Sequence, residues 1–146
     1  MIDYGCRIGN DVKIHTSCCI AQYTEIGDGA FLAPGVTITN DLYPGRSDSA
    51  EVMSGPTIGA GAQLGGNVTV LPFVRIGDRC LVGAGSVVTR DLPARSVAFG
   101  NPARVRGSVD DLVDIGSRVQ VDGDSASRYR FASGPPAGSD AAGARQ

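Results

Sequence analysis

The chain has 146 residues, a formal net charge of −2 and 42% hydrophobic residues, which indicates one modest domain. Aromatic residues make up 5% of the chain and glycine occurs 21 times, so a core of aliphatic side chains is expected. Acidic and basic residues balance at 9 each as far as Gly107, which argues against a nucleic-acid partner. The sequence contains no long apolar run and no signal-peptide pattern, and it therefore predicts a cytoplasmic protein outside the membrane. The four cysteines lack metal-ligand spacing, so reduced thiols are expected.

Aliphatic residues recur every six residues in two blocks of the chain. A helix does not explain this period, because six is not a multiple of about 3.6 and frequent glycine destabilises a helix. A simple alternating strand does not explain it either, since glycine or alanine often follows the aliphatic residue. The period predicts a solenoid of short parallel strands and tight corners, with about four turns if three hexads make one turn. The aliphatic positions are Ile2, Ile8, Ile14, Ile20, Ile26, Leu32, Ile38, Ile58, Leu64, Val70, Ile76, Val82 and Val88.

The hexad register breaks between Ile38 and Ile58, and residues 40–56 are therefore predicted to leave the solenoid as a functional loop. The solenoid domain is expected to span residues 1–107, with SVAF as its last strand. Residues 108–131 form an extension of open role, and residues 132–146 have the composition of a disordered tail. The chain begins inside a hexad, which predicts an open strand edge at that end.

Two segments near the C-terminal end of the solenoid carry a family resemblance. They read IGDRCLVGAGSVVTRDLP (76–93) and GNPARVRG (100–107). Together with the repeat, they resemble the hexapeptide-repeat acyltransferases, all-β proteins built on a left-handed parallel β-helix. Within that family, FLAPGVTITNDLYPGRS (31–47) and the block at 56–77 are most similar to acetyltransferases that act on amino groups of nucleotide-linked sugars. The resemblance implies acetyl-CoA as co-substrate, a sugar nucleotide as acceptor, no metal, and a homotrimer with active sites between subunits.

Acetyl transfer needs a nucleophile, a route for its proton and donors for the developing oxyanion. Asn40 opens the loop and matches an asparagine that faces the acceptor amine in the amino-sugar enzymes, although asparagine is also a common turn former. Asp41 beside it is a candidate to hold the ammonium group or accept a proton. His15 is the only histidine and is expected on the surface. It is either a plain surface side chain or a base across a subunit cleft.

Binding residues are expected in the loop and near the C-terminal end of the solenoid. Arg46 lies in PGRS, which resembles a PRS segment of the sugar-nucleotide relatives, and its guanidinium suits a diphosphate or a carboxylate. Gly45 departs from the spacing of that segment. The resemblance further implies coenzyme A contacts at small residues and at arginines for its phosphates, namely Gly65, Gly83, Ala84, Gly85, Arg90, Arg104 and Arg106.

The same fold serves other chemistry, so alternatives stay open. A γ-type carbonic anhydrase needs three metal-binding histidines, and a single histidine excludes it. Serine acetyltransferases use a pair of histidines, and the maltose and galactoside enzymes place a catalytic histidine at the loop, where this chain has Asn40, Asp41 and Leu42. A sugar O-acetyltransferase with His15 as its base is the first alternative. A non-catalytic trimeric scaffold is the second.

Overall fold

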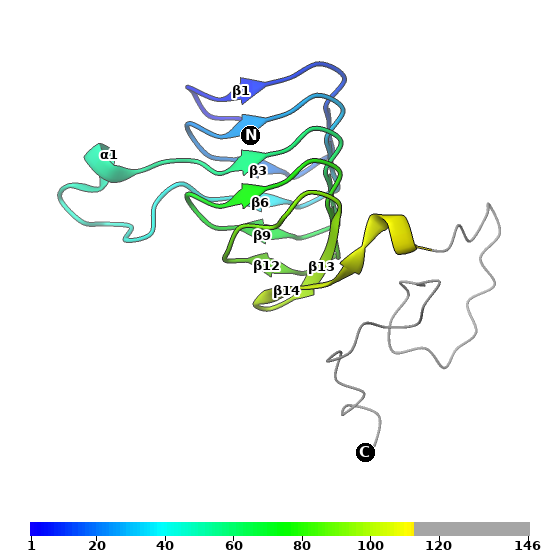
Figure 1. Ribbon diagram of the computed structural model, residues 1–146. Helices are drawn as coiled ribbons and strands as arrows, with labels where there is room; N and C mark the ends of the chain where they lie inside the picture. The colour runs from blue at the N-terminus through cyan, green and yellow to red at the C-terminus, as the bar shows by residue number, and fades with distance from the viewer. Residues whose placement is uncertain (113–146) are drawn as a thin grey trace.

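A computed structural model describes residues 1–112 of the chain. Each hexad from that of Ile8 onward forms a two-residue strand followed by a corner, and three strands complete one turn, as the period predicts. Equivalent positions of successive turns pair in parallel, as Ile8 does with Ile26. The structure confirms an all-β solenoid with four complete three-stranded turns (Figure 1).

Three parallel sheets form the faces of this prism. Face 1 consists of β1 (Arg7–Ile8), β4 (Glu25–Ile26), β7 (Thr57–Ile58) and β10 (Arg75–Ile76). Face 2 contains β2 (Lys13–Ile14), β5 (Phe31–Leu32), β8 (Gln63–Leu64), β11 (Leu81–Val82), β13 (Ser96–Gly100) and β14 (Ala103–Ser108). Face 3 is built from β3 (Cys19–Ile20), β6 (Thr37–Ile38), β9 (Thr69–Val70) and β12 (Val87–Val88).

The core is a set of aliphatic ladders that run along the inside of the prism. The repeat aliphatics from Ile20 to Val88 are at most 3% exposed, whereas Ile2 and Ile8 in the first turn are 50% and 39% exposed. The slot four residues after each aliphatic also points inward, and it holds two buried polar side chains. Thr24 donates to the carbonyl of Ala21 at 2.7 Å and Ser86 to that of Gly83 at 2.6 Å, so neither hydroxyl is buried without a partner.

The corners stack into three edges that we name by their composition. The glycine edge, between faces 1 and 2, holds Gly9, Gly27, Gly59 and Gly77. The histidine edge, between faces 2 and 3, holds His15, Ala33, Gly65 and Gly83. The loop edge, between faces 3 and 1, holds Ala21, Thr39, Leu71 and Thr89.

The glycine edge exists because successive turns approach too closely for a side chain. A Cβ on Gly27 would lie 2.6 Å from the backbone nitrogen of Ala60, and one on Gly77 would lie 2.4 Å from that of Ala94. At this edge, glycine is therefore required by the close approach of successive backbones.

The predicted loop leaves the prism at the loop edge, between β6 and β7, and projects away from the stack (Figure 1). It contains one helical turn that the sequence analysis did not predict, α1 (Ser49–Val52). At the C-terminal end, SVAF lies in β13 as predicted, and β14 folds back on β13 in antiparallel register. A short 3-10 helix, Val109–Asp111, follows β14. From residue 113 onward, the expected extension (108–131) and tail (132–146) lie outside the described residues.

Candidate functional site

Asn40 stands at the neck of the loop, directly after the corner residue Thr39. Its backbone carbonyl accepts a hydrogen bond from the nitrogen of Ser54 at 2.8 Å, which closes the neck. Its Nδ2 donates to Oε1 of Gln22 at 3.4 Å and to Sδ of Met53 at 3.3 Å. The amide of Asn40 is thus half-buried and oriented by one side chain from the prism and one from the returning loop.

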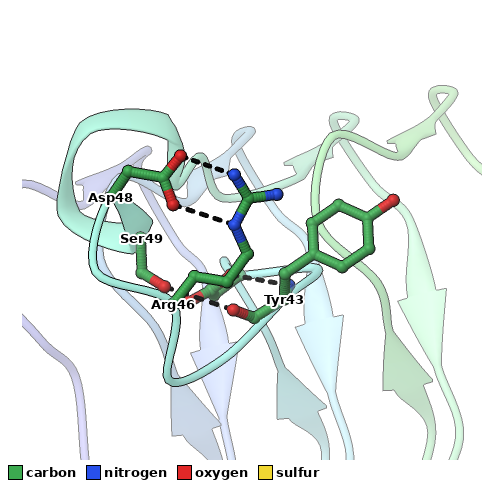
Figure 2. A network of polar contacts seen from close by, with 5 residues as sticks. Tyr43, Arg46, Asp48 and Ser49 are labelled. Carbon is green, nitrogen blue, oxygen red and sulfur yellow. Dashed lines mark hydrogen bonds and ion pairs between the residues drawn. The ribbon is translucent and has the colours of Figure 1, made fainter.

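The outer part of the loop is organised around Arg46 (Figure 2). The guanidinium binds Asp48 through two hydrogen bonds, Nε to Oδ1 at 2.9 Å and Nη2 to Oδ2 at 2.6 Å. It also lies 5.5 Å from the ring centre of Tyr43, whose carbonyl accepts from the Ser49 hydroxyl at 3.2 Å. Asp41 caps this segment, since its Oδ1 accepts from the Tyr43 nitrogen at 2.8 Å. The Arg46 side chain remains 57% exposed, so a ligand can reach it.

His15 lies on the histidine edge in the first turn and is exposed, as predicted. Its ring packs at a tilt against Phe31 of the next turn, with 4.8 Å between ring centres. Because β2, β5, β8 and β11 pair in register, the residues that follow them align along one edge. His15 therefore shares an edge with Gly65 and Gly83, roughly 10 and 14 Å away at the usual strand spacing.

The small residues of the histidine edge have structural reasons of their own. A Cβ on Gly65 would lie 2.6 Å from the backbone nitrogen of Ala84, so close stacking of turns already requires a glycine there. Gly85 has a φ of +71° and open space beside it, and Ala84 is exposed. A coenzyme A contact at Gly65, Gly83, Ala84 or Gly85 remains a prediction.

The three candidate arginines are not gathered at one place. Arg90 follows β12 at the loop edge and is exposed. Arg104 and Arg106 lie on β14, the outermost strand of face 2. The Arg106 guanidinium lies 5.6 Å from the ring centre of Phe99, and its Nε is buried without a hydrogen-bond partner among the described residues.

The candidate catalytic residues stand at two different edges of the prism. His15 precedes face 3 and Asn40 follows it, so the width of that face separates them within one chain. An open groove of about 590 Å³ runs along face 1 between Arg7 and Asp78, and one of about 420 Å³ lies between Arg79 and Val109. Neither groove is lined by a residue that the sequence analysis proposed for the site.

Sequence reasoning missed the partners of the candidate residues. Gln22 and Met53 orient Asn40 from positions 18 and 13 residues away, and no local pattern marks them. Asp48 lies only two residues after Arg46, and this short spacing of opposite charges was a usable signal.

Two ionisable groups have shifted pKa values for clear physical reasons. A hydrogen bond and ion pair from Arg95 hold the pKa of the Asp110 carboxyl below its ordinary value of 3.8. Burial raises the pKa of the Cys80 thiol above 9.0. All four cysteines are free thiols, and no cluster of three metal-binding side chains occurs within residues 1–112. In the same part of the chain, no helix has the length and apolar character to cross a membrane.

Comparison with known proteins places this geometry among transferases. A family model described as bacterial transferase hexapeptide (six repeats) matches residues 5–40 and 55–90. Galactoside O-acetyltransferase of Escherichia coli (strain K12) is 40% identical over 97 residues, which are 63% of this chain and 48% of that protein.

Two solved structures share the fold. A variant of perosamine N-acetyltransferase from Caulobacter crescentus, in complex with CoA and GDP-perosamine, has a TM-score of 0.62 and 31% identity, covering 73% of this chain and 44% of that one. Maltose O-acetyltransferase from Clostridium difficile 630 has a TM-score of 0.62 and 35% identity, covering 72% and 59%. The chain thus spans between 44% and 59% of the length of these three proteins. The repeat match and the shared architecture show that the chain belongs to the hexapeptide-repeat transferase family, with its left-handed parallel β-helix.

Proposed function

We propose that this protein transfers an acetyl group from acetyl-CoA to an amino group of a nucleotide-linked sugar. In this reaction the neutral amine attacks the thioester carbonyl and forms the C–N bond. The C–S bond then breaks, and the coenzyme A sulfur leaves with the proton that the amine gives up. An amine is nucleophilic without a strong base, so a positioned polar side chain suffices where a hydroxyl acceptor would need a base.

The observation that carries the proposal is the amide of Asn40 at the neck of the loop. Its Nδ2 is directed at Gln22 and Met53, which leaves Oδ1 to accept a hydrogen bond from a substrate amine. Within residues 1–112, no imidazole or carboxylate makes a hydrogen bond to this amide. The neck therefore suits an acceptor that needs to be oriented by Asn40 and does not need a strong base. Asp41 next to Asn40 is a candidate partner for the ammonium form of the amine.

The Arg46 side chain supports an anionic acceptor. Its planar fork already binds a carboxylate with two hydrogen bonds in the loop, the geometry that also recognises a diphosphate. We infer that the diphosphate of the sugar nucleotide replaces Asp48 on Arg46 when the acceptor binds.

Acetyl-CoA is assigned to the histidine edge and the C-terminal end of the prism. Gly65, Gly83, Ala84 and Gly85 keep side chains small along that edge, so a pantetheine chain can reach backbone groups. Arg90, Arg104 and Arg106 are candidates for the coenzyme phosphates. Within residues 1–112, the buried Nε of Arg106 has no hydrogen-bond partner, and an anionic group would satisfy this donor.

A homotrimer, which the family resemblance implies, agrees with the placement of these groups. The coenzyme candidates Gly65 and Gly83 stand across face 3 from Asn40, so one chain alone does not bring these residues and the acceptor together. A second copy whose histidine edge faces the loop edge of the first would complete the site. Sedimentation analysis should then give a mass near three times the 15.0 kDa of the chain.

A sugar O-acetyltransferase is the alternative that one observation favours. His15 is exposed on the same edge as the coenzyme candidates, and two of the relatives described above are named O-acetyltransferases. Under this alternative, a hydroxyl acceptor would lose its proton to His15.

The test is a turnover panel with purified protein, acetyl-CoA, UDP-linked and GDP-linked amino sugars, and matched hydroxyl sugars. Loss of thioester absorbance is the better readout, because the partly exposed thiols of Cys6 and Cys19 would react with a thiol reagent. Turnover confined to amines, lost in Asn40→Ala but kept in His15→Ala, supports the proposal. Asn10→Ala, at an exposed position on the glycine edge, is the matched control. Turnover of hydroxyl sugars that His15→Ala abolishes supports O-acetylation, and absence of both turnover and acetyl-CoA binding supports the scaffold.

A further inference from the structure

The third residue after each aliphatic of the repeat adopts a left-handed backbone conformation at most corners. Small residues, Asp, Asn or Arg occupy most of these positions: Gly5, Asp11, Ser17, Gly29, Gly35, Gly61, Asn67, Arg79, Gly85 and Arg95. Only Tyr23 (φ 64°) and Phe73 (φ 64°) are aromatic among the described residues. Both lie on the loop edge, in the corners immediately before and after the loop.

Burial does not explain these two aromatic residues. A left-handed backbone costs a bulky residue roughly 1–2 kcal/mol relative to glycine. Yet Tyr23 is 43% exposed and Phe73 is 53% exposed, and neither side chain belongs to the hydrophobic core. Exposed aromatic side chains at an unfavourable backbone position are typical of a binding surface.

Both aromatic residues lie next to the neck of the loop. Gln22, which precedes Tyr23, contacts the amide of Asn40 at 3.4 Å. Gly55 of the returning loop stacks on the backbone of Tyr23 and Thr24, and the next corner along the edge is that of Phe73. The backbone nitrogen of Glu25 donates to the carbonyl of Pro56 at 3.0 Å, and the backbone nitrogen of Thr57 donates to the carbonyl of Val74 at 2.9 Å. The three corners therefore lie in consecutive layers of the solenoid.

The spacing of these layers leaves room for a ring. Two turns separate the backbones of Tyr23 and Phe73, which is roughly 10 Å at the usual strand spacing. A ring in van der Waals contact with an aromatic face on each side occupies roughly 7–8 Å. The layer between them holds Gly55, which contributes no side chain to this surface and stacks so closely on the preceding turn that a Cβ there would lie 2.4 Å from the nitrogen of Thr24.

Tyr4 restrains the first of the two rings. It meets Tyr23 edge to face with 5.8 Å between ring centres. A hydrogen bond that the Tyr4 hydroxyl donates to the Tyr23 side chain raises the pKa of the Tyr4 phenol, which agrees with two phenols held together at the edge. The ring of Tyr23 is therefore positioned before any ligand arrives.

We propose that Tyr23 and Phe73 set acceptor specificity by contacting the faces of the sugar ring whose amine lies at Asn40. This inference rests on the proposed function, because it assigns the ring next to the reacting amine. The apolar C–H faces of a pyranose pack on aromatic rings, while its polar rim reaches the amides of Asn40 and Gln22.

The test measures binding by calorimetry, apart from turnover, with UDP-linked and GDP-linked amino sugars as probes. Asparagine tolerates the left-handed conformation, so Tyr23→Asn and Phe73→Asn remove the rings without adding strain. Each variant should bind the amino-sugar nucleotides about tenfold more weakly, equal to about 1.4 kcal/mol. Its melting temperature should be unchanged or higher, and its affinity for acetyl-CoA unchanged. Arg79→Asn, at a left-handed position on the glycine edge, should bind like the wild type.

Binding of UDP and GDP, which lack the amino sugar, shows whether Tyr23 and Phe73 contact the sugar ring or the nucleotide. If the variants keep their affinity for these nucleotides, the sugar assignment stands, whereas an equal loss for them overturns it. Wild-type affinity of both variants for the amino-sugar nucleotides, or no binding by the wild type, also overturns the inference. A wild type that binds these probes but releases no coenzyme A refutes the proposed transfer alone.

Discussion

A methyl group at Gly59 tests whether the glycine edge is set by close stacking of turns. The Cβ of an alanine there would lie 2.5 Å from the backbone nitrogen of Asp78 and 2.6 Å from the carbonyl carbon of Gly77. These neighbours are backbone atoms of the next turn, so they cannot rotate away. Overpacking costs about 1–3 kcal/mol, and we expect the upper part of this range because two turns must separate. Replacing glycine by alanine also lowers the conformational entropy of the unfolded chain, and this offsets only about 0.4–1 kcal/mol of the overpacking cost.

Gly66→Ala is the matched control in the same turn. Its Cβ would lie 3.5 Å from the carbonyl oxygen of Pro34, an ordinary contact, and its φ is not left-handed. We expect Gly59→Ala to lose about 2 kcal/mol, a fall in melting temperature of roughly 8 °C or more, and Gly66→Ala to change by about 0.5 kcal/mol or less. Thermal and urea unfolding followed by circular dichroism measure both. Equal stabilities of the two variants would refute the stacking argument.

Three further predictions concern stability and thiol chemistry. Ile58→Ala should cost about 2–4 kcal/mol in urea unfolding and Ile8→Ala about 1 kcal/mol, because these two members of the same ladder are 1% and 39% exposed. Similar losses for the two variants would contradict the ladder. The pKa of Asp110 is lowered by Arg95, so this pair stabilises the fold above pH 3.8 and its contribution disappears as the pH falls through the lower folded value. Asp110→Asn should therefore lessen the acid sensitivity of the melting temperature, and an unchanged pH profile would count against the pair. Cys80 is fully buried with a raised thiol pKa, so mass spectrometry should find it alkylated only after unfolding.

The fold could be predicted because the residues that determine it recur at a constant six-residue spacing. Each turn repeats the same three aliphatic positions, so the ladders, the corners and the break at the loop can all be read from spacing. The second half of the repeat resumes at Ile58, directly above Ile26, which the sequence period alone implies once a loop is removed. The fold-back of β14 on β13 has no period and was not predicted in its antiparallel form.

The candidate site was less predictable, since it depends on contacts that no repeat encodes. The sequence marked Asn40 and Arg46 by their place in the loop, but not the side chains that orient them. Gln22 reaches Asn40 across one full turn, and Asp48 binds Arg46 through the local shape of the loop. His15 and Asn40 stand at opposite edges of face 3, so the fold keeps them apart within one chain.

The narrow neck of the loop makes the excursion a replaceable module. Ser54 bonds back to Asn40 at 2.8 Å, so the two ends of the insertion meet like neighbours in an ordinary corner. Closing a longer loop at such a neck costs only about 0.6 kcal/mol for each doubling of its length. Residues 41–53 can therefore be lengthened, shortened or exchanged during evolution without disturbing the ladders on either side. An ancestor with this scaffold could change what it acts upon by rewriting one peptide while the rest of the molecule stayed as it was.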